Sequence, residues 1–131
     1  MIPRDVMIVD DNADCRIVLR SMLEASDYTV RTAESGPEAL ALIDERKPDV
    51  VLLDFMMPGM TGIDVLERLR AEHATARIPV IMITARIDDD DVLVGYQHGA
   101  DYYITKPCTA RQVMHGIALV LGELTDKASA A

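Results

Sequence analysis

Reactive polar side chains follow short apolar runs at four points in this sequence. In chain order they are the carboxylates Asp10 and Asp11, the carboxylate Asp54, the hydroxyl of Thr84 and the amine of Lys106. Ligands of open parallel sheets bind outside the carboxyl ends of the strands, so these side chains are expected to gather at one edge. Three carboxylates that meet there repel one another unless a cation lies between them, and oxygen ligands with open positions suit a hydrated Mg²⁺. The pattern therefore predicts an acidic, magnesium-binding site.

Asp54 is the candidate for the reactive group of this site. The run Val50–Leu53 is too short for a helix and rich in branched side chains, which predicts a strand buried on both faces. Asp54 stands at the carboxyl end of that strand, and Pro58 and Gly59 turn the chain soon afterwards. The alternative is that Asp54 only begins this turn. The other strand-end side chains favour the reactive role over the structural one.

The elements that must hold these side chains alternate short apolar strands with amphipathic helices. Strands are expected at residues 6–9, 28–33, 50–53, 78–83 and 101–105, with helices beginning near residues 12–14, 35, 61, 88 and 109. Right-handed crossovers then imply a parallel sheet with helices on both faces. The predicted fold class is α/β, a flavodoxin-like (βα)5 doubly wound sheet with strand order 2-1-3-4-5. Strands one and three are neighbours in that order, so Asp10, Asp11 and Asp54 would meet between them.

The ends of the expected helices carry local signals. Ser35 with Glu38, and Thr109 with Gln112, have the spacing of a capping box. Gly99 is expected to end the fourth helix. The first helix, capped by Asn12 or Asp14, is expected to carry Cys15, Val18, Leu19, Met22 and Leu23 on one face.

Length, charge and cysteine content narrow the class of protein. The 131 residues correspond to one domain, and the formal net charge of -9 repels phosphate backbones and anionic lipid, so direct nucleic-acid binding is not expected. Cys15 and Cys108 lack metal-ligand spacing and are expected to be free thiols. The start MIPRDVMIVDDN has no signal-peptide character, and no apolar run reaches membrane-spanning length. A soluble, cytoplasmic protein is expected.

The constellation resembles the receiver domain of two-component response regulators. The resemblance is carried by Asp10-Asp11 after strand one, Asp54 before MMPGMTG, Thr84-Ala85 after strand four, and Tyr103 with Lys106-Pro107 at strand five. It covers the chain from about Asp5 to Leu124. We therefore expect a receiver domain in residues 1–124 and a short flexible tail in residues 125–131.

The resemblance implies a role for each matching residue. Asp54 corresponds to the phosphoacceptor, and Thr84 and Lys106 correspond to the groups that hold phosphoryl oxygens. The implied Mg²⁺ ligands are Asp11 directly, Asp10 mainly through water, Asp54, and the backbone carbonyl of Met56. Thr84 and Tyr103 would form the switch, and the Lys106–Pro107 peptide bond would be cis.

The function implied by the resemblance is signalling. A sensor histidine kinase or a histidine phosphotransfer protein would donate the phosphoryl group to Asp54. Phosphorylation would switch the surface of the fourth helix, fifth strand and fifth helix, which would contact a downstream protein or a second copy of the chain. Such a domain promotes only its own phosphorylation and dephosphorylation and is not an enzyme for a separate substrate.

Two alternatives to phosphorylation signalling remain from the residues. One is a receiver-like interaction module that works without phosphorylation, against which the intact Asp11, Asp54, Thr84 and Lys106 argue. The other is a metal-dependent phosphatase or phosphotransferase, whose nucleophile would follow the first strand with a second acid two residues on. Here the two acids after the first strand are adjacent, which argues against that class.

The sequence departs from the family pattern in modest ways. Cys108 stands where the family usually has an aromatic residue, which removes packing area at the start of the last helix. Met56 and Arg86 occupy variable positions that influence how fast the family's aspartyl phosphate is lost.

Overall fold

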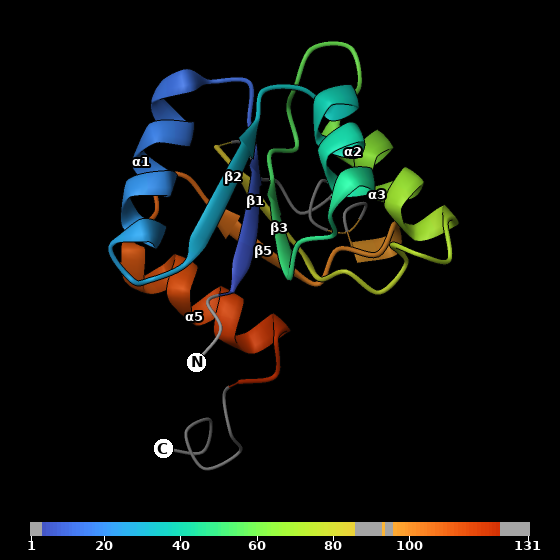
Figure 1. Cartoon of the computed structure of the whole chain (residues 1–131). Coiled ribbons are helices and arrows are strands. Elements are labelled where there is room, and N and C mark those ends of the chain that lie inside the picture. The colour runs from blue at the N-terminus through green and yellow to red at the C-terminus, as the bar shows by residue number, and fades with distance from the viewer. Residues whose placement is uncertain (1–3, 86–92, 94–95, 124–131) are drawn as a thin grey trace.

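The computed structural model describes residues 4–85, 93 and 96–123. Within them, one parallel sheet has the order β2-β1-β3-β4-β5, which confirms the predicted flavodoxin-like topology. The strands are β1 Asp5–Val9, β2 Thr29–Ala33, β3 Val50–Leu53, β4 Val80–Thr84 and β5 Tyr102–Thr105. The helices are α1 Ala13–Glu24, α2 Gly36–Glu45, α3 Gly62–Ala71 and α5 Ala110–Val120. Figure 1 shows α1 and α5 on one side of the sheet and α2 and α3 on the other.

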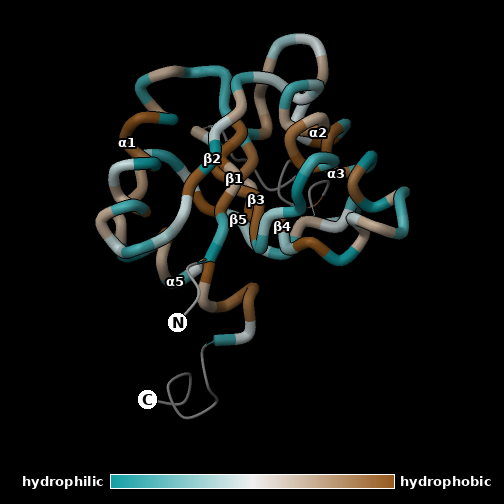
Figure 2. Tube along the Cα trace, in the orientation of Figure 1, coloured by the Kyte–Doolittle hydropathy of each residue, from teal (hydrophilic) through white to brown (hydrophobic). Residues whose placement is uncertain are grey.

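Two apolar layers sandwich the sheet. Alternate residues of each strand point to opposite faces, so Met7 and Val9 pack toward α2 and α3 while Val6 and Ile8 pack toward α1 and α5. The central strand β3 is buried along its whole length, as predicted for a strand covered on both faces. Figure 2 shows hydrophobic colour along the central strands β1 and β3. The sheet is therefore a rigid support for groups at its carboxyl edge.

The strand β4 begins later than predicted because of a proline. Ile78 was expected to open the strand, and it is buried, but the ladder starts at Val80. Pro79 accepts a hydrogen bond from the amide of Val51 at 2.9 Å. Pro79 has no amide hydrogen to donate, so regular pairing begins with the next residue.

The helix α1 is capped by the first of its two candidate residues. The side chain of Asn12 accepts a hydrogen bond from the amide of Cys15 at 3.0 Å, so Asn12 rather than Asp14 is the cap.

The helix α3 has a complete capping box. Thr61 accepts from the amide of Asp64 at 3.3 Å, and the Asp64 carboxylate accepts from the amide of Thr61 at 2.9 Å.

The two capping boxes predicted by spacing have different outcomes. Thr109 and Gln112 form the full reciprocal pair at 3.1 and 2.8 Å, as predicted. Ser35 accepts from the amide of Glu38 at 3.3 Å, but the Glu38 carboxylate accepts from the amide of Glu34 at 3.0 Å. The box at α2 is therefore only half formed, because the Glu38 side chain reaches one residue further back.

The apolar face of α1 is only partly in the core. Leu19 and Leu23 are buried and Met22 is half-buried, but Val18 is 51% exposed. Val18 lies on the predicted face of α1, together with Cys15, Leu19 and Met22, but this face borders a pocket in front of the ends of β4 and β5. Helical periodicity places a residue on a face of the helix, but it does not say how closely the neighbouring element approaches.

Some predictions fall on residues that are not described. They concern the helix start at Asp88–Asp91, Arg86, Leu124 and the tail 125–131, all of which lie outside the described residues. The predicted stop at Gly99 is confirmed, since Gly99 has a φ of 102° and its amide donates to the carbonyl of Tyr96 at 3.1 Å. In the part of the chain that is described, no helix has the length and apolar character to cross a bilayer.

A single arginine of α3 ties together segments that are distant in the sequence. The guanidinium of Arg70 donates to the carbonyls of Gly99, Ala76 and Ile78 at 2.8, 3.2 and 2.7 Å. It also donates to the Asp101 carboxylate at 2.9 Å, and the Arg70 side chain is only 21% exposed. Arg70 therefore fixes the approaches to both β4 and β5.

Arg70→Met is expected to lower the free energy of unfolding by about 2 kcal/mol, because several partly buried acceptors lose their donor. Denaturant unfolding measures this change. Arg68→Met is the matched control, since Arg68 lies on the same helix and is exposed. Equal losses of unfolding free energy in the two variants would contradict this role of Arg70.

Candidate functional site

The sheet topology brings the three predicted carboxylates together. Val9 and Leu53 are paired in the register of β1 and β3, so the acids that follow them leave the sheet at the same level. Asp10, Asp11 and Asp54 each offer an oxygen, and these oxygens lie within 4.8 Å of one another. The predicted cluster between strands one and three is present.

Asp10 is the buried centre of the cluster. It is 2% exposed, and its Oδ1 accepts a hydrogen bond from the amide of Asn12 at 2.9 Å. Its Oδ2 accepts from Nζ of Lys106 at 2.5 Å, and its backbone carbonyl accepts from Arg16 at 2.7 Å. Asp11, the next residue, is exposed and faces solvent from the rim.

Asp54 lies directly after β3 and is 7% exposed. Its Oδ1 accepts from the amide of Met56 at 3.2 Å, and its Oδ2 lies 3.6 Å from Nζ of Lys106. Burial raises the pKa of the Asp54 carboxyl, and the nearby charge of Asp10 raises it further, while Lys106 opposes this. A second cation beside Asp54 would relieve the repulsion.

Lys106 supplies a positive charge that both buried acids share. Burial alone lowers the pKa of its amine, but the hydrogen bond to Asp10 and the charges of Asp54 and Asp10 outweigh it, so the pKa is raised overall. The amine is therefore protonated at neutral pH. It contacts Asp10 at 2.5 Å and is further, at 3.6 Å, from Asp54.

The donor set of the cluster fits a hard divalent cation. The three carboxylates carry three negative charges, and Lys106 contributes one positive charge beside them. The available atoms are oxygens, and exposed Asp11 leaves one side open to water. Oxygen ligands with room for water are what Mg²⁺ prefers.

The other predicted site residues surround the cluster. Met56 follows in the loop after β3 with its side chain 51% exposed, and Thr84 is buried at the end of β4. The Lys106 amide donates to the Thr84 carbonyl at 2.9 Å, and the Lys106–Pro107 bond is cis, as the resemblance implied. The structure thus brings these residues to the same edge as the acids.

Tyr103 lies on β5 at some distance along the strand from the cluster. Tyr103 packs with the layer of α2 and α3 and Tyr102 with the layer of α1 and α5, which confirms that the two rings point to opposite faces. The ring of Tyr103 also contacts that of Tyr96, with centroids 5.9 Å apart and planes tilted by 56°. This aromatic pair joins β5 to the segment that precedes Gly99, and the spacing analysis did not identify Tyr96 as part of it.

Gly62 is a site-supporting residue that sequence reasoning missed. A Cβ at Gly62 would lie 2.3 Å from the Asp54 carbonyl oxygen and 2.9 Å from Cα of Phe55. The Gly62 amide donates to the Phe55 carbonyl at 3.0 Å, so α3 begins in direct contact with the backbone of the site. A glycine in the first helical position, directly after the Thr61 cap, is the sequence signal that could have indicated this contact.

The sequence also matches a known protein family. The model for the response regulator receiver domain matches residues 6–118. The chain belongs to this family. A relative, the phosphate regulon transcriptional regulatory protein PhoB of Pseudomonas aeruginosa, is 40% identical over 121 residues, which are 92% of this chain and 53% of that protein. The receiver domain spans about half the length of the curated relatives that it matches.

Solved receiver domains have the same architecture. The CheY-like response regulator receiver domain protein of Methanospirillum hungatei gives a TM-score of 0.85 at 28% identity, over 93% of this chain and 96% of that one. The chemotaxis protein CheY4 of Vibrio cholerae gives 0.86 at 28% identity, over 91% and 99% of the two chains. The receiver fold therefore extends over nearly the whole described chain.

Proposed function

We propose that this receiver domain accepts a phosphoryl group on Asp54 with the help of Mg²⁺. The observation that carries the proposal is the position of Asp54, a buried carboxylate beside two further acids and 3.6 Å from the amine of Lys106. Transfer of a phosphoryl group depends mainly on positioning and on neutralising charge, and these neighbours serve both needs.

The proposed step forms one bond and breaks another. An Oδ of Asp54 attacks phosphorus, and the P–N bond of a phosphohistidine, or the P–O bond of an acyl phosphate, breaks with its electron pair leaving on the donor. Asp11 and Asp54 would hold Mg²⁺ directly with the Met56 carbonyl, and Asp10 would act mainly through water. The ion would supply positive charge to the phosphoryl oxygens.

Lys106 and Thr84 are proposed to hold the new phosphoryl group. The amine of Lys106 is already within reach of Asp54, and it can exchange part of its contact with Asp10 for a phosphoryl oxygen. Thr84 ends β4 at the same edge and carries a hydroxyl that can donate a hydrogen bond. The phosphoryl group adds nearly two negative charges by analogy with other phosphorylated side chains, so these two donors would respond to it.

The proposed partners follow from this chemistry. The phosphoryl donor is a sensor histidine kinase or a histidine phosphotransfer protein in the cytoplasm. The output is a downstream protein, or a second copy of the chain, that contacts the surface around β5 and α5. A receiver domain in residues 1–124 belongs to the same proposal. If the chain did not accept a phosphoryl group but still bound its downstream partner, it would instead be a phosphorylation-independent interaction module.

Incubation of the chain with Mg²⁺ and acetyl phosphate, followed by intact mass measurement, tests the proposal. A single phosphoryl adduct that depends on Mg²⁺ is expected. Continuous release of phosphate without an adduct would indicate a phosphatase. No adduct and no turnover would contradict phosphorylation and leave the interaction module.

Asp11→Ala is expected to weaken Mg²⁺ binding by roughly tenfold or more, because a carboxylate bound directly to the ion contributes at least as much as outer partners do. A Mg²⁺ titration followed by NMR measures the affinity. Asp14→Ala is the matched control, since it removes the same charge from an exposed position three residues away. Equal affinity in the Asp11 variant and the wild type would refute the metal site.

In the proposed switch, the ring of Tyr103 moves inward when the hydroxyl of Thr84 is drawn to the phosphoryl group. Thr84→Ala is expected to uncouple phosphorylation from this movement of Tyr103 without abolishing phosphorylation. A phosphoryl group can shift a two-state element only through its differential interaction with the two states, and the hydroxyl of Thr84 provides that interaction. The measurement is NMR of Tyr103 with and without a phosphoryl mimic, in the wild type and in Thr84→Ala. Equal shifts in both proteins would mean that the coupling follows another route.

A further inference from the structure

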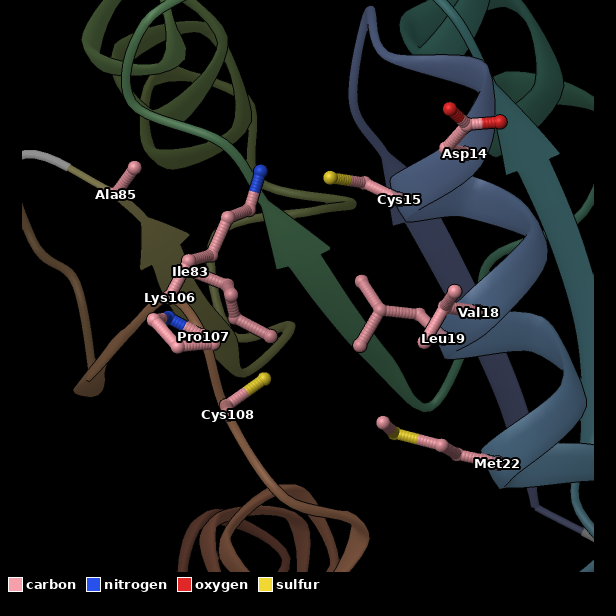
Figure 3. Close-up of a pocket in the computed structure, with 10 residues that line it drawn as sticks. All are labelled: Asp14, Cys15, Val18, Leu19, Met22, Ile83, Ala85, Lys106, Pro107 and Cys108. Carbon is pink, nitrogen blue, oxygen red and sulfur yellow. The ribbon is translucent and has the colours of Figure 1, made fainter.

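An apolar pocket of about 360 Å³ lies beside the acid cluster, between α1 and the ends of β4 and β5. We call it the sulfur-lined pocket, because three of its lining residues carry sulfur atoms. Figure 3 shows Cys15 and Met22 reaching into it from α1, with Cys108 opposite them on the segment that follows β5. Val18, Leu19 and Ile83 complete most of its surface. We propose that this pocket binds a small neutral aromatic molecule.

The size of the pocket suits one or two fused rings. Pockets that hold small molecules usually measure roughly 300–1,000 Å³, and a cavity of about 150 Å³ is enough for benzene. The space exists because Cys15, Ala85 and Cys108 are short side chains on facing walls. Both cysteines are half-buried and Val18 is 51% exposed, so a ligand can enter the pocket from solvent.

The chemistry of the walls favours an aromatic occupant. Sulfur atoms make favourable contacts with ring edges, and the sulfurs of Cys15, Met22 and Cys108 face the same space from two sides. The branched side chains of Leu19 and Ile83 offer flat apolar surface to a ring. A saturated molecule of the same size would gain the apolar contacts but not the sulfur contacts.

The charges at one end of the pocket favour a neutral occupant. The amine of Lys106 reaches this end, but it is held by Asp10 at 2.5 Å and lies 3.6 Å from Asp54. An anionic ligand would have to compete with both acids for that amine. Asp14, also at this end, would repel an anion, and the described residues at the opposite end, Met22 and Cys108, offer no carboxylate to a cation. A neutral ring avoids both penalties.

Occupancy of the pocket is expected to affect the phosphorylation site. Lys106 and Pro107 line the pocket, and the amine of Lys106 also contacts the acids. A ring packed against the Lys106 stem restricts the movement by which the amine would turn from Asp10 to a phosphoryl oxygen. This consequence rests on the proposed function, whereas the binding itself does not.

Indole, titrated into the isotopically labelled chain without any phosphoryl donor, tests the binding. Chemical-shift changes confined to the methyl groups of Val18, Leu19, Met22 and Ile83 are expected, with weaker binding of cyclohexanol. Indole is also expected to slow alkylation of Cys15 and Cys108 by iodoacetamide. Absence of both effects at millimolar indole would overturn the proposal. Protection of the thiols only when a histidine kinase domain is present would also overturn it, in favour of a partner's side chain.

Cys108→Phe fills the pocket and is expected to weaken indole binding by about tenfold or more, because the new ring occupies the ligand's space. Leu119→Phe is the matched control, since it adds a ring to the exposed face of α5 outside the pocket. Unchanged binding in Cys108→Phe would overturn the proposal. If that variant does not fold, the protection of Cys15 and Cys108 by indole against alkylation in the wild type decides whether the pocket binds the ring.

A second experiment distinguishes a failure of the pocket proposal from a failure of the proposed function. Acetyl phosphate and Mg²⁺ are added with and without indole, and the rate of adduct formation is followed by mass. A changed rate supports the link through Lys106. Failure to form any adduct, together with localised NMR shifts, would contradict phosphorylation while upholding the pocket.

Discussion

Asp54→Asn is expected to abolish phosphorylation of the chain and to leave it folded. The amide of asparagine is a poor nucleophile, so no acyl phosphate can form at this position. The side chain keeps its size and can still accept the hydrogen bond from the amide of Met56, now 3.2 Å from Oδ1. Incubation with Mg²⁺ and acetyl phosphate, followed by intact mass, measures the loss.

The stability of this variant is expected to be unchanged or higher. Burial, and then the charge of Asp10, raise the pKa of the Asp54 carboxyl, so keeping this group as a carboxylate costs the folded protein some stability. A neutral amide removes that penalty, and thermal unfolding measures the effect. Asp14→Asn is the matched control, because Asp14 is an exposed acid near the same edge. Full labelling of Asp54→Asn would show that another residue is the acceptor.

Gly62→Ala is expected to lower the free energy of unfolding by about 3 kcal/mol and to impair the site. The new Cβ would lie 2.3 Å from the carbonyl oxygen and 3.0 Å from the carbonyl carbon of Asp54. These are backbone atoms next to the central strand, so the start of α3 must move and its hydrogen bond to Phe55 is strained. Denaturant unfolding measures the loss, and the phosphorylation assay reports the displacement of Asp54.

Gly36→Ala is the matched control for this prediction. Gly36 is also buried and also opens a helix, but its Cβ would meet the side chain of Met60, at 2.7 Å from the sulfur, and that of Val65. A flexible methionine can move aside more easily than a backbone carbonyl, so the loss of stability should be smaller. A smaller loss in Gly62→Ala than in Gly36→Ala would contradict the close approach of α3 to the site.

The sequence alone was sufficient to predict the sheet topology and the proximity of the three acidic side chains. Short apolar runs identify buried strands, and parallel strands end at one edge, so Asp10, Asp11 and Asp54 had to come close together once the order 2-1-3-4-5 was adopted. Cap residues such as Thr109 and Gln112 were also predictable, because a capping box involves only neighbours in the chain. Interactions that depend on local spacing, or on strand order, can be worked out from residue types.

The tertiary structure decided the features that depend on how closely elements approach. Lys106 lies nearer to Asp10 than to Asp54, and Gly62 touches the backbone of Asp54, although no sequence pattern distinguishes these distances. Arg70 donates to carbonyls that lie 6 and 29 residues further along the chain, and the periodicity of α3 does not predict these contacts. Val18 has the spacing of a core residue but borders a pocket. Periodicity gives the direction in which a side chain points, whereas its contacts depend on the packing of other elements against it.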